Sequence, residues 1–316
     1  MPSADVDRTR HEPWPPLPYD EWTETLETLH RWTQIVGKIA LAQKPFLNEW
    51  WNVAFPLTAR GMTTGIMPAV GGTLEIDFDF VEHRLDLRRG DGQTRTLPLR
   101  AQSVAAFYRD VMAALAALGT TVTIDPRTVE LPVVERLDQD ETHASYDPDA
   151  ANRWQRVMLE TALVMQRFRT PFVGKSSPIH FFWGSFDLCT TRFSGRSATV
   201  PASAPRFYQL AEDQENFTCG FWPGNPTMSG LTLAEPAFYA YGYPEPPGCR
   251  AAPVQPQGAA FGLDFGEFLL PYDDVRAAPD PDAAVLSFFQ STYDVVANLG
   301  AWDRAELERP AAERER

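Results

Sequence analysis

Hydrophobic residues recur at helical spacing in four stretches of the chain. In the first, residues 22–36 place hydrophobic side chains on one face, and the following Gly37 suits a left-handed C-cap, so a helix ending near Gly37 is predicted. The second follows Asp147, where an Asp before a Pro is typical of an N-cap and first helical position, and its hydrophobic face runs through residues 154–168. The other two predicted helices lie within residues 104–119 and 285–300.

The clearest strand pattern lies between residues 74 and 88. Hydrophobic side chains alternate with acids from Leu74 to Phe80, and with charged residues from Arg84 to Arg88, which predicts two antiparallel strands with one solvated face. The acids on that face are also candidate metal ligands. The arginines that would lie opposite them favour ordinary surface pairing instead.

The chain also shows a repeated order of predicted elements. Aromatic-rich extended segments at residues 50–58 and 181–189 each follow a predicted helix, and further strands and another helix follow each of them. We therefore predict an α+β fold of two similar halves, each with antiparallel strands covered by helices, which indicates an internal duplication. The predicted units are a flexible N-terminal segment at 1–17, halves at 18–135 and 136–303 that share one core, and a flexible charged tail at 304–316.

Charge and composition narrow the classes of partner. With 28 Lys plus Arg against 42 Asp plus Glu, the net charge is −14, which disfavours binding to nucleic acids and to anionic membranes. The sequence shows neither a signal-peptide pattern nor an apolar run of the roughly 18 residues needed to span a membrane, so a cytoplasmic protein is expected. The odd number of cysteines, 3, without a CxxC pair indicates neither a disulfide framework nor a thiolate zinc site.

Two histidines lie where the regular patterns are interrupted. His180 stands in the aromatic segment 180–187, and a histidine with a pKa near neutrality in such surroundings is readily used as a general acid or base. We therefore predict an acid/base pocket around His180, with His143 and Tyr146 as auxiliary catalytic groups. Pairing of His180 with Asp187 on one strand would require a bulge, for which Gly184 is suitable. A core histidine bonded to the backbone is the alternative.

Binding residues are predicted around the same segment. Arg192 and Arg196 flank a Ser-Gly turn and could hold an anionic group by forked hydrogen bonds, although a surface turn with paired charges fits equally well. The remaining predicted substrate-binding residues are Lys175, Trp183 and Glu245. Aromatic residues of three later segments, together with Glu245 and Glu267, could also form a stacking and carboxylate pocket, or simply a β core.

No motif identifies a particular reaction or cofactor. The sequence contains no GxGxxG, GxxxxGK[ST], HExxH or GxSxG motif, and no metal site is predicted. The leading hypothesis is an enzyme acting on a small molecule. The alternative is a non-catalytic protein that binds a sugar-like molecule or small anion through Trp183, Trp222, Tyr241 and Tyr243, or an interaction protein.

Several long motifs together resemble a known family. They are TLHRWTQIVGK at 28–38, THASYDP at 142–148, HFFWGSFDL at 180–188, FWPG at 221–224 and YPEP at 243–246. They resemble a bacterial domain-of-unknown-function family, number 5996, over most of the chain from Trp14 to Trp302. The resemblance implies a cytoplasmic bacterial protein and assigns no activity, cofactor or catalytic residue.

Overall fold

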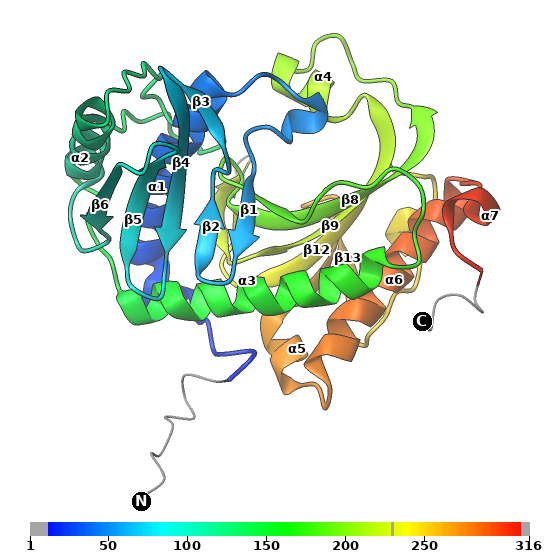
Figure 1. Cartoon of the computed structure of the whole chain (residues 1–316). Coiled ribbons are helices and arrows are strands. Elements are labelled where there is room, and N and C mark those ends of the chain that lie inside the picture. The colour runs from blue at the N-terminus through cyan, green and yellow to red at the C-terminus, as the bar shows by residue number, and fades with distance from the viewer. Residues whose placement is uncertain (1–11, 229–230, 311–316) are drawn as a thin grey trace, which may run out of the picture.

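The computed structural model describes residues 12–228 and 231–310, and most of its strands form one large antiparallel sheet (Figure 1). The helices of the first half are α1 (Tyr19–Gln43), the 3-10 helix η2 (Asn48–Trp50) and α2 (Val104–Ala117). Those of the second half are α3 (Pro148–Arg169), α4 (Arg206–Ala211), the 3-10 helix η3 (Cys249–Ala251), α5 (Tyr272–Ala277), α6 (Pro281–Leu299) and α7 (Arg304–Leu307). The mixed α+β class predicted from the sequence is confirmed.

The two halves contribute neighbouring blocks of strands to this sheet. The first half supplies β1 (Phe55–Thr58), β2 (Gly61–Thr63), β3 (Met67–Ala69), β4 (Gly72–Asp79), β5 (Arg84–Arg89) and β6 (Thr94–Pro98). The second half supplies β7 (His180–Phe182), β8 (Asp187–Ser197), β9 (Gln214–Trp222), β12 (Ala237–Tyr243), β13 (Ala260–Gly262) and β14 (Glu267–Pro271). A separate hairpin consists of β10 (Asn225–Met228) and β11 (Leu231–Leu233).

The halves meet where the first strands of each half pair. The order across the sheet is β13-β14-β12-β9-β8-β7-β1-β2-β4-β5-β6, with β3 beside β4. In the central pair, Phe55 lies opposite Phe181 and Pro56 opposite His180. Each half thus runs outward from the centre as a helix, a series of antiparallel strands and a further helix. Duplication of one ancestral half stays a prediction.

Helices cover one face of the sheet and enclose a continuous aromatic core. Figure 1 shows α3 running along both halves, with α6 beside the second. The Trp154 ring of α3 stacks on Phe186, with their centroids 4.9 Å apart, and meets Phe181 and Phe80 edge-on. Because Phe80 comes from the first half and Phe181 from the second, the halves share one core, in which each large ring removes a substantial apolar area from water.

Helix α1 is longer than the sequence pattern predicts. The prediction of a C-cap at Gly37 is wrong, because α1 continues to Gln43. Gly37 lies inside the helix, and a Cβ at this position would overlap the indole ring of Trp183. The glycine is therefore explained by close packing of a helix against a tryptophan, and not by a left-handed turn.

Other local predictions are confirmed. The Asp147 side chain accepts hydrogen bonds from the backbone N–H groups of Asp149 and Ala150, with Pro148 in the first turn of α3. In the β4–β5 pair, Glu75 lies opposite Arg88, and the Arg88 guanidinium pairs with Asp77 and Asp86. The acids of this strand face are thus held by arginines, as ordinary surface pairing requires.

The ends of the described chain are packed. Trp14 and Leu17 lie in the segment expected to be flexible, but both are buried, and the Trp14 ring meets Phe238 edge-on at 6.0 Å. In the expected tail, α7 forms, and Glu308 accepts hydrogen bonds from Arg304 and Tyr293. Residues 1–11 and 311–316 of the two expected flexible segments lie outside the described residues. Among the helices of the described chain, none is both long enough and apolar enough to cross a membrane.

Candidate functional site on the polar face of the second half

The strands of the second half have two chemically different faces. Alternate side chains, such as those of Leu188, Phe221 and Phe238, join the main hydrophobic core with α3 and α6. The intervening side chains point the other way and include acids, aromatic rings and a thiol. We call this surface the polar face, and define it by Asp187 and Cys189 of β8, Thr218 and Trp222 of β9, Tyr239 and Tyr241 of β12, and Glu267 of β14.

Asp187 is the central acid of the polar face. Its carboxylate accepts hydrogen bonds from the hydroxyl groups of Ser185 and Tyr239, and its side chain is only 7% exposed. The Trp222 indole N–H donates to the Ser185 carbonyl at 3.1 Å, which fixes the turn before β8. Burial raises the pKa of Asp187, while its two hydroxyl donors lower that pKa. The hydrogen bonds orient this acid towards the neighbouring strands.

Three further carboxyl groups border Asp187 or its neighbours. Burial, followed by the charge of Asp187, raises the pKa of Glu267 to about 8 and that of Glu130 to about 7. Much of Glu130 is exposed, but its carboxyl group lies against Gly184, where a side chain would overlap it. Burial also raises the pKa of Glu212 to about 7, and Glu212 accepts hydrogen bonds from Asn216 at 2.6 Å and Tyr241 at 3.4 Å. These acids exchange protons near neutral pH.

Unusual backbone conformations concentrate beside these carboxyl groups. Among the described residues other than glycine, six have positive φ angles, and Glu49, Trp50, Glu130 and Phe186 are four of them. Phe186 directly precedes Asp187, and the charge of Glu49 acts on Glu212. A bulky residue in this conformation costs on the order of 1 kcal/mol, and such strain is found at functional sites.

Aromatic rings form the remainder of the polar face. Tyr239 and Tyr241 stack with their centroids 6.4 Å apart and their planes at 11°, and Phe265 meets Trp222 edge-on at 6.5 Å. Gly220 leaves room for the Tyr239 ring, since a Cβ there would overlap it. Flat rings beside polar groups are typical of sites that bind small molecules.

The predicted catalytic residue His180 lies on the same side of the sheet as the polar face. It pairs in register with Cys189, but the chain turns back between β7 and β8, so the bulge expected at Gly184 does not form. The His180 side chain is 3% exposed, its Nε2 has no partner among the described residues, and burial, followed by the charge of Arg169, lowers its pKa to about 3. His180 is therefore neutral at neutral pH and is not a proton donor there.

His143 and Tyr146 lie in a different environment. His143 Nδ1 bonds to Asp140 Oδ2 at 2.8 Å, and His83 Nδ1 bonds to the Tyr146 hydroxyl at 2.9 Å. Tyr146 also stacks on Trp32 of α1 at 5.6 Å. No described contact joins these residues to His180, so the structure does not bring the three predicted catalytic groups together. Their catalytic role stays a prediction.

The two predicted anion-binding arginines are separated as well. Arg192 is buried, with its guanidinium 3.5 Å from the Phe168 ring centroid and 4.3 Å from that of Tyr293, and it donates to the Phe168 carbonyl. Arg196 is exposed and donates to the Gly300 carbonyl at 2.5 Å, where it caps the end of α6. Both have structural partners, and they do not converge on one ligand position.

The other predicted binding residues contact three separate parts of the chain. Lys175 pairs with Glu49 at 2.7 Å beside the polar face. The Trp183 indole N–H donates to the Val53 carbonyl at 3.0 Å, and its ring packs on α1. Glu245 pairs with Arg250 at 2.8 Å on the surface. Lys175 is thus connected to the acids described above through Glu49, whose charge acts on Glu212.

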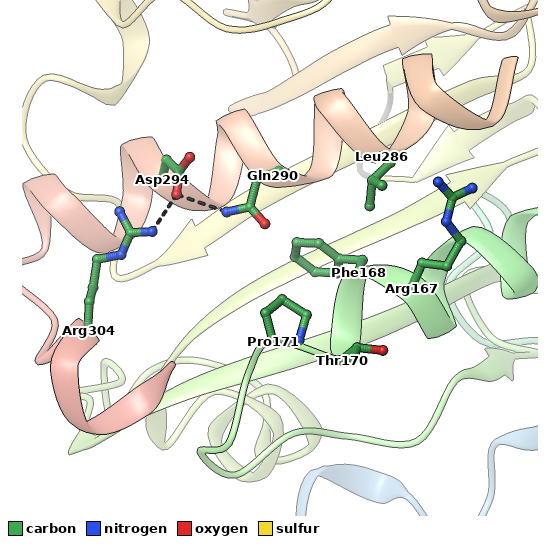
Figure 2. A pocket seen from close by; sticks show the side chains of 8 residues that line it. All are labelled: Arg167, Phe168, Thr170, Pro171, Leu286, Gln290, Asp294 and Arg304. Carbon is green, nitrogen blue, oxygen red and sulfur yellow. Dashed lines mark hydrogen bonds and ion pairs between the residues drawn. The ribbon is translucent and has the colours of Figure 1, made fainter. Parts of the chain in front are cut away.

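Two surface cavities lie elsewhere. One, of about 360 Å³, is between α3 and α6, and Figure 2 shows that its Asp294 is bonded to Gln290 and Arg304. The other, of about 260 Å³, borders His143. There Glu135, Asp140 and His143 are close enough to hold a metal ion, but the Arg31 guanidinium pairs with both carboxylates, at 2.7 and 3.4 Å. The acids lining these cavities already have cationic partners.

The polar face was only partly visible in the sequence. Glu267, Trp222 and Tyr241 belong to the stacking and carboxylate pocket considered above, and Asp187 was considered as a partner of His180. Glu130 and Glu212 were missed, because each stands in a connecting segment without a strand pattern. The sequence offers one local feature that could have drawn attention to Glu130, namely the apolar run at residues 131–134 that directly follows it.

The fold and this site define an α+β protein with a helix-covered core on one side of its sheet and a largely buried face rich in carboxyl groups and aromatic rings on the other. The chain belongs to a family of unknown function (DUF5996), whose family model matches residues 14–309. The family resemblance predicted from the motifs is thereby confirmed. No curated protein and no solved structure matches the chain.

Proposed function

We propose that the protein is an enzyme that binds a small molecule at the polar face and uses carboxyl groups, not His180, for acid/base chemistry. The observation that supports this most strongly is the set of carboxyl groups around the polar face whose pKa values are raised to about 7 and 8. Groups that titrate near the working pH are effective general acids and bases. Aromatic rings on the same face of the sheet provide flat apolar groups next to these acids.

Roles follow from the hydrogen bonds. Asp187, which accepts from Ser185 and Tyr239, is held in one orientation and acts as the base or as the charge-stabilising group. Glu267, half-buried and with a pKa of about 8 in the free protein, releases and takes up a proton within the neutral range and acts as the proton-transfer group. Two carboxyl groups with different surroundings thus take different roles.

The experiment is a substrate search followed by a variant comparison. The purified protein is incubated with mixtures of small amines, sugars and carboxylic acids, and substrate loss is followed by NMR. Asp187→Asn and Glu267→Gln are expected to lower turnover of the substrate by about 100-fold or more. Glu141→Gln, an exposed residue paired with Arg109, is the matched control. Full turnover by folded Asp187→Asn and Glu267→Gln proteins would contradict the proposal.

A second candidate function is binding without catalysis. The parallel Tyr239–Tyr241 rings favour it, because such surfaces stack on flat or sugar-like ligands. It predicts that a ligand is bound and released unchanged, with Asp187→Asn affecting affinity alone. The same NMR experiment separates the two functions.

The cellular setting is also a proposal. We propose a cytoplasmic bacterial protein that does not bind nucleic acid. The net charge of −14 supports the second part, and the free thiols of Cys189, Cys219 and Cys249 fit a reducing compartment.

A further inference from the structure

Buried acids elsewhere in the protein have a cationic partner, but those of the polar face do not. Five acidic residues are less than 9% exposed among the described residues: Glu49, Asp79, Asp86, Asp187 and Glu212. The first three pair with Lys175, Arg60 and Arg88 respectively, at 2.6 to 2.9 Å. Asp187 and Glu212 form no ion pair with any described residue, and neither do the neighbouring Glu130 and Glu267. Uncompensated acids in such positions are costly for the protein.

The chain itself shows how an ammonium group is held in this region. The Lys175 ammonium lies 2.7 Å from the Glu49 carboxylate, 4.4 Å from the centroid of the Phe193 ring and 5.3 Å from that of Trp51. Cations are attracted both by the carboxylate and by the negative faces of the rings. The polar face offers the same two components, with Asp187 and Glu267 beside Tyr239 and Tyr241, but no lysine or arginine of the described chain pairs with its acids.

An orphaned polar atom on the same side of the sheet is an independent observation. His180 is 97% buried, and its Nε2 has no hydrogen-bond partner among the described residues. Its register with Cys189 places it on the side of the sheet that carries the polar face. A neutral imidazole carries one N–H donor and one acceptor nitrogen, so this atom can bond to a polar group of a ligand in either tautomer. The acids and the rings favour a ligand that carries positive charge, and the unpartnered ring nitrogen favours one that forms hydrogen bonds.

We propose that the substrate of the polar face is a small organic cation with a primary ammonium group. This inference rests on the proposed function of the same surface and names its substrate class. The ammonium group pairs with the carboxylates of Asp187 and Glu267, and the hydrocarbon part lies against the tyrosine rings. The net charge of −14 attracts such cations towards the protein.

Binding of a cation must then be linked to proton release. Carboxyl groups with pKa values of about 7 to 8 are partly protonated at pH 7, and a bound cation favours their ionised forms. The free energy of binding therefore becomes more favourable as the pH rises from 6 to about 8.5. A neutral ligand of the same shape shows no such dependence.

The test is calorimetric titration of the full-length protein with n-butylamine, 1,4-diaminobutane and benzylamine, with n-butanol and glucose as neutral probes. Each titration is made at pH 8 in phosphate and in HEPES, whose ionisation enthalpies differ. We expect at least one amine to bind, with a buffer-dependent heat that reports proton release, and with affinity at least ten-fold weaker in Glu267→Gln. Glu141→Gln should bind like the unaltered protein.

Each other outcome rejects the inference in a distinguishable way. If glucose or n-butanol binds as well as the amines and depends on Asp187, the polar face is a binding site for a neutral ligand, so the proposed function survives and the cation is rejected. If no amine binds at millimolar concentration, the inference fails. If in addition no neutral probe binds and an identified substrate is turned over normally by Asp187→Asn and Glu267→Gln, the proposed function fails too.

Discussion

At the residue scale, single glycines decide where large rings are placed. Gly37 admits the Trp183 indole against α1, and Gly220 admits the Tyr239 ring beside Asp187. The contact at Gly37 packs the junction of the two halves. The contact at Gly220 places Tyr239, whose hydroxyl group donates a hydrogen bond to Asp187 and orients it. A sequence shows such a glycine, but not the ring that needs it.

Gly37→Ala gives a direct test of the first contact. Alanine alone would stabilise a helix by about 1 kcal/mol relative to glycine. Overlap of its Cβ with Trp183 should instead lower the free energy of unfolding by about 1 to 3 kcal/mol, as overpacking does. Urea unfolding of the variant measures the difference. A variant more stable than the unaltered protein would show that the ring does not press on this position.

His180 illustrates the limit of reading chemistry from residue type. Aromatic neighbours were correctly expected around it, and the ring does lie 4.7 Å from Phe182. Whether such surroundings tune a histidine or simply bury it depends on solvent access, which the sequence does not contain. Burial lowers its pKa to about 3, and this moves the proposed acid/base role to carboxyl groups.

At the element scale, the last strand residues of β8 secure the end of α6. Arg196 donates to the carbonyl oxygens of Gly300 and Ala301, at 2.5 and 3.0 Å, and pairs with Glu215 at 2.6 Å. A cation at this end of a helix satisfies unpaired carbonyl groups and opposes the negative end of the helix dipole. The arginine predicted to bind a substrate anion has this structural partner instead.

Arg196→Gln should therefore destabilise the protein without affecting the polar face. The loss of a charged cap is expected to lower the free energy of unfolding by about 1 kcal/mol, as seen in chemical denaturation. Arg95→Gln, on the exposed strand β6, is the matched control and should change it by less than about 0.5 kcal/mol. Equal stability of the two variants would contradict the capping role.

Elements with a local signal were predictable. The alternation of β4 and β5, the Asp147 cap of α3 and the helical stretches of α2 and α6 each depend on neighbouring residues alone. The turn between β7 and β8 was not, because residues 181–189 have the composition of one aromatic-rich extended segment and Phe186 takes a positive φ that its residue type does not favour. Tertiary packing against Trp154 determines that turn.

At the scale of the whole molecule, one face of the sheet packs against the helices in the hydrophobic core, and the opposite face of the second half is the polar face. The α+β class and the hydrophobic faces of the long helices could be predicted from hydrophobic spacing, whereas the polar face arises from strands and loops distant in sequence. Glu130 and Glu267 approach Asp187 only through the fold. Their mutual repulsion is a property of the assembled molecule, so no local pattern indicates it.

This arrangement predicts how stability varies with pH. Folded pKa values of about 7 to 8 for Glu130, Glu212 and Glu267 exceed their ordinary value of 4.5, so the stability that these groups contribute is lost as pH rises from 4.5 to 8. His30 and His180 have folded pKa values of about 4 and 3, below their ordinary value of 6.5. They lower the stability as the pH falls below 6.5, because there they bind protons in the unfolded chain but not in the folded one. Because three carboxyl groups outweigh two histidines, thermal unfolding should show the greatest stability near about pH 4.5 to 5 and a decline from there towards pH 8.

Glu267→Gln should flatten the alkaline part of this profile. Its free energy of unfolding, relative to the unaltered protein, is expected to rise by about 1 to 2 kcal/mol between pH 6 and 8.5, after allowing for partial solvent screening. Glu141→Gln provides the control profile. Parallel profiles for Glu267→Gln and the unaltered protein would show that Glu267 ionises normally.

The most direct measurement is a carbon-13 NMR titration of the side-chain carboxyl groups, with resonances assigned from Glu130→Gln, Glu212→Gln and Glu267→Gln. We predict midpoints near 7 for Glu130 and Glu212 and near 8 for Glu267, all moving towards lower pH when an amine is bound. Midpoints near 4.5, the value for a solvated glutamate, would show that the polar face is an ordinary hydrated surface and would contradict its role as an acid/base site.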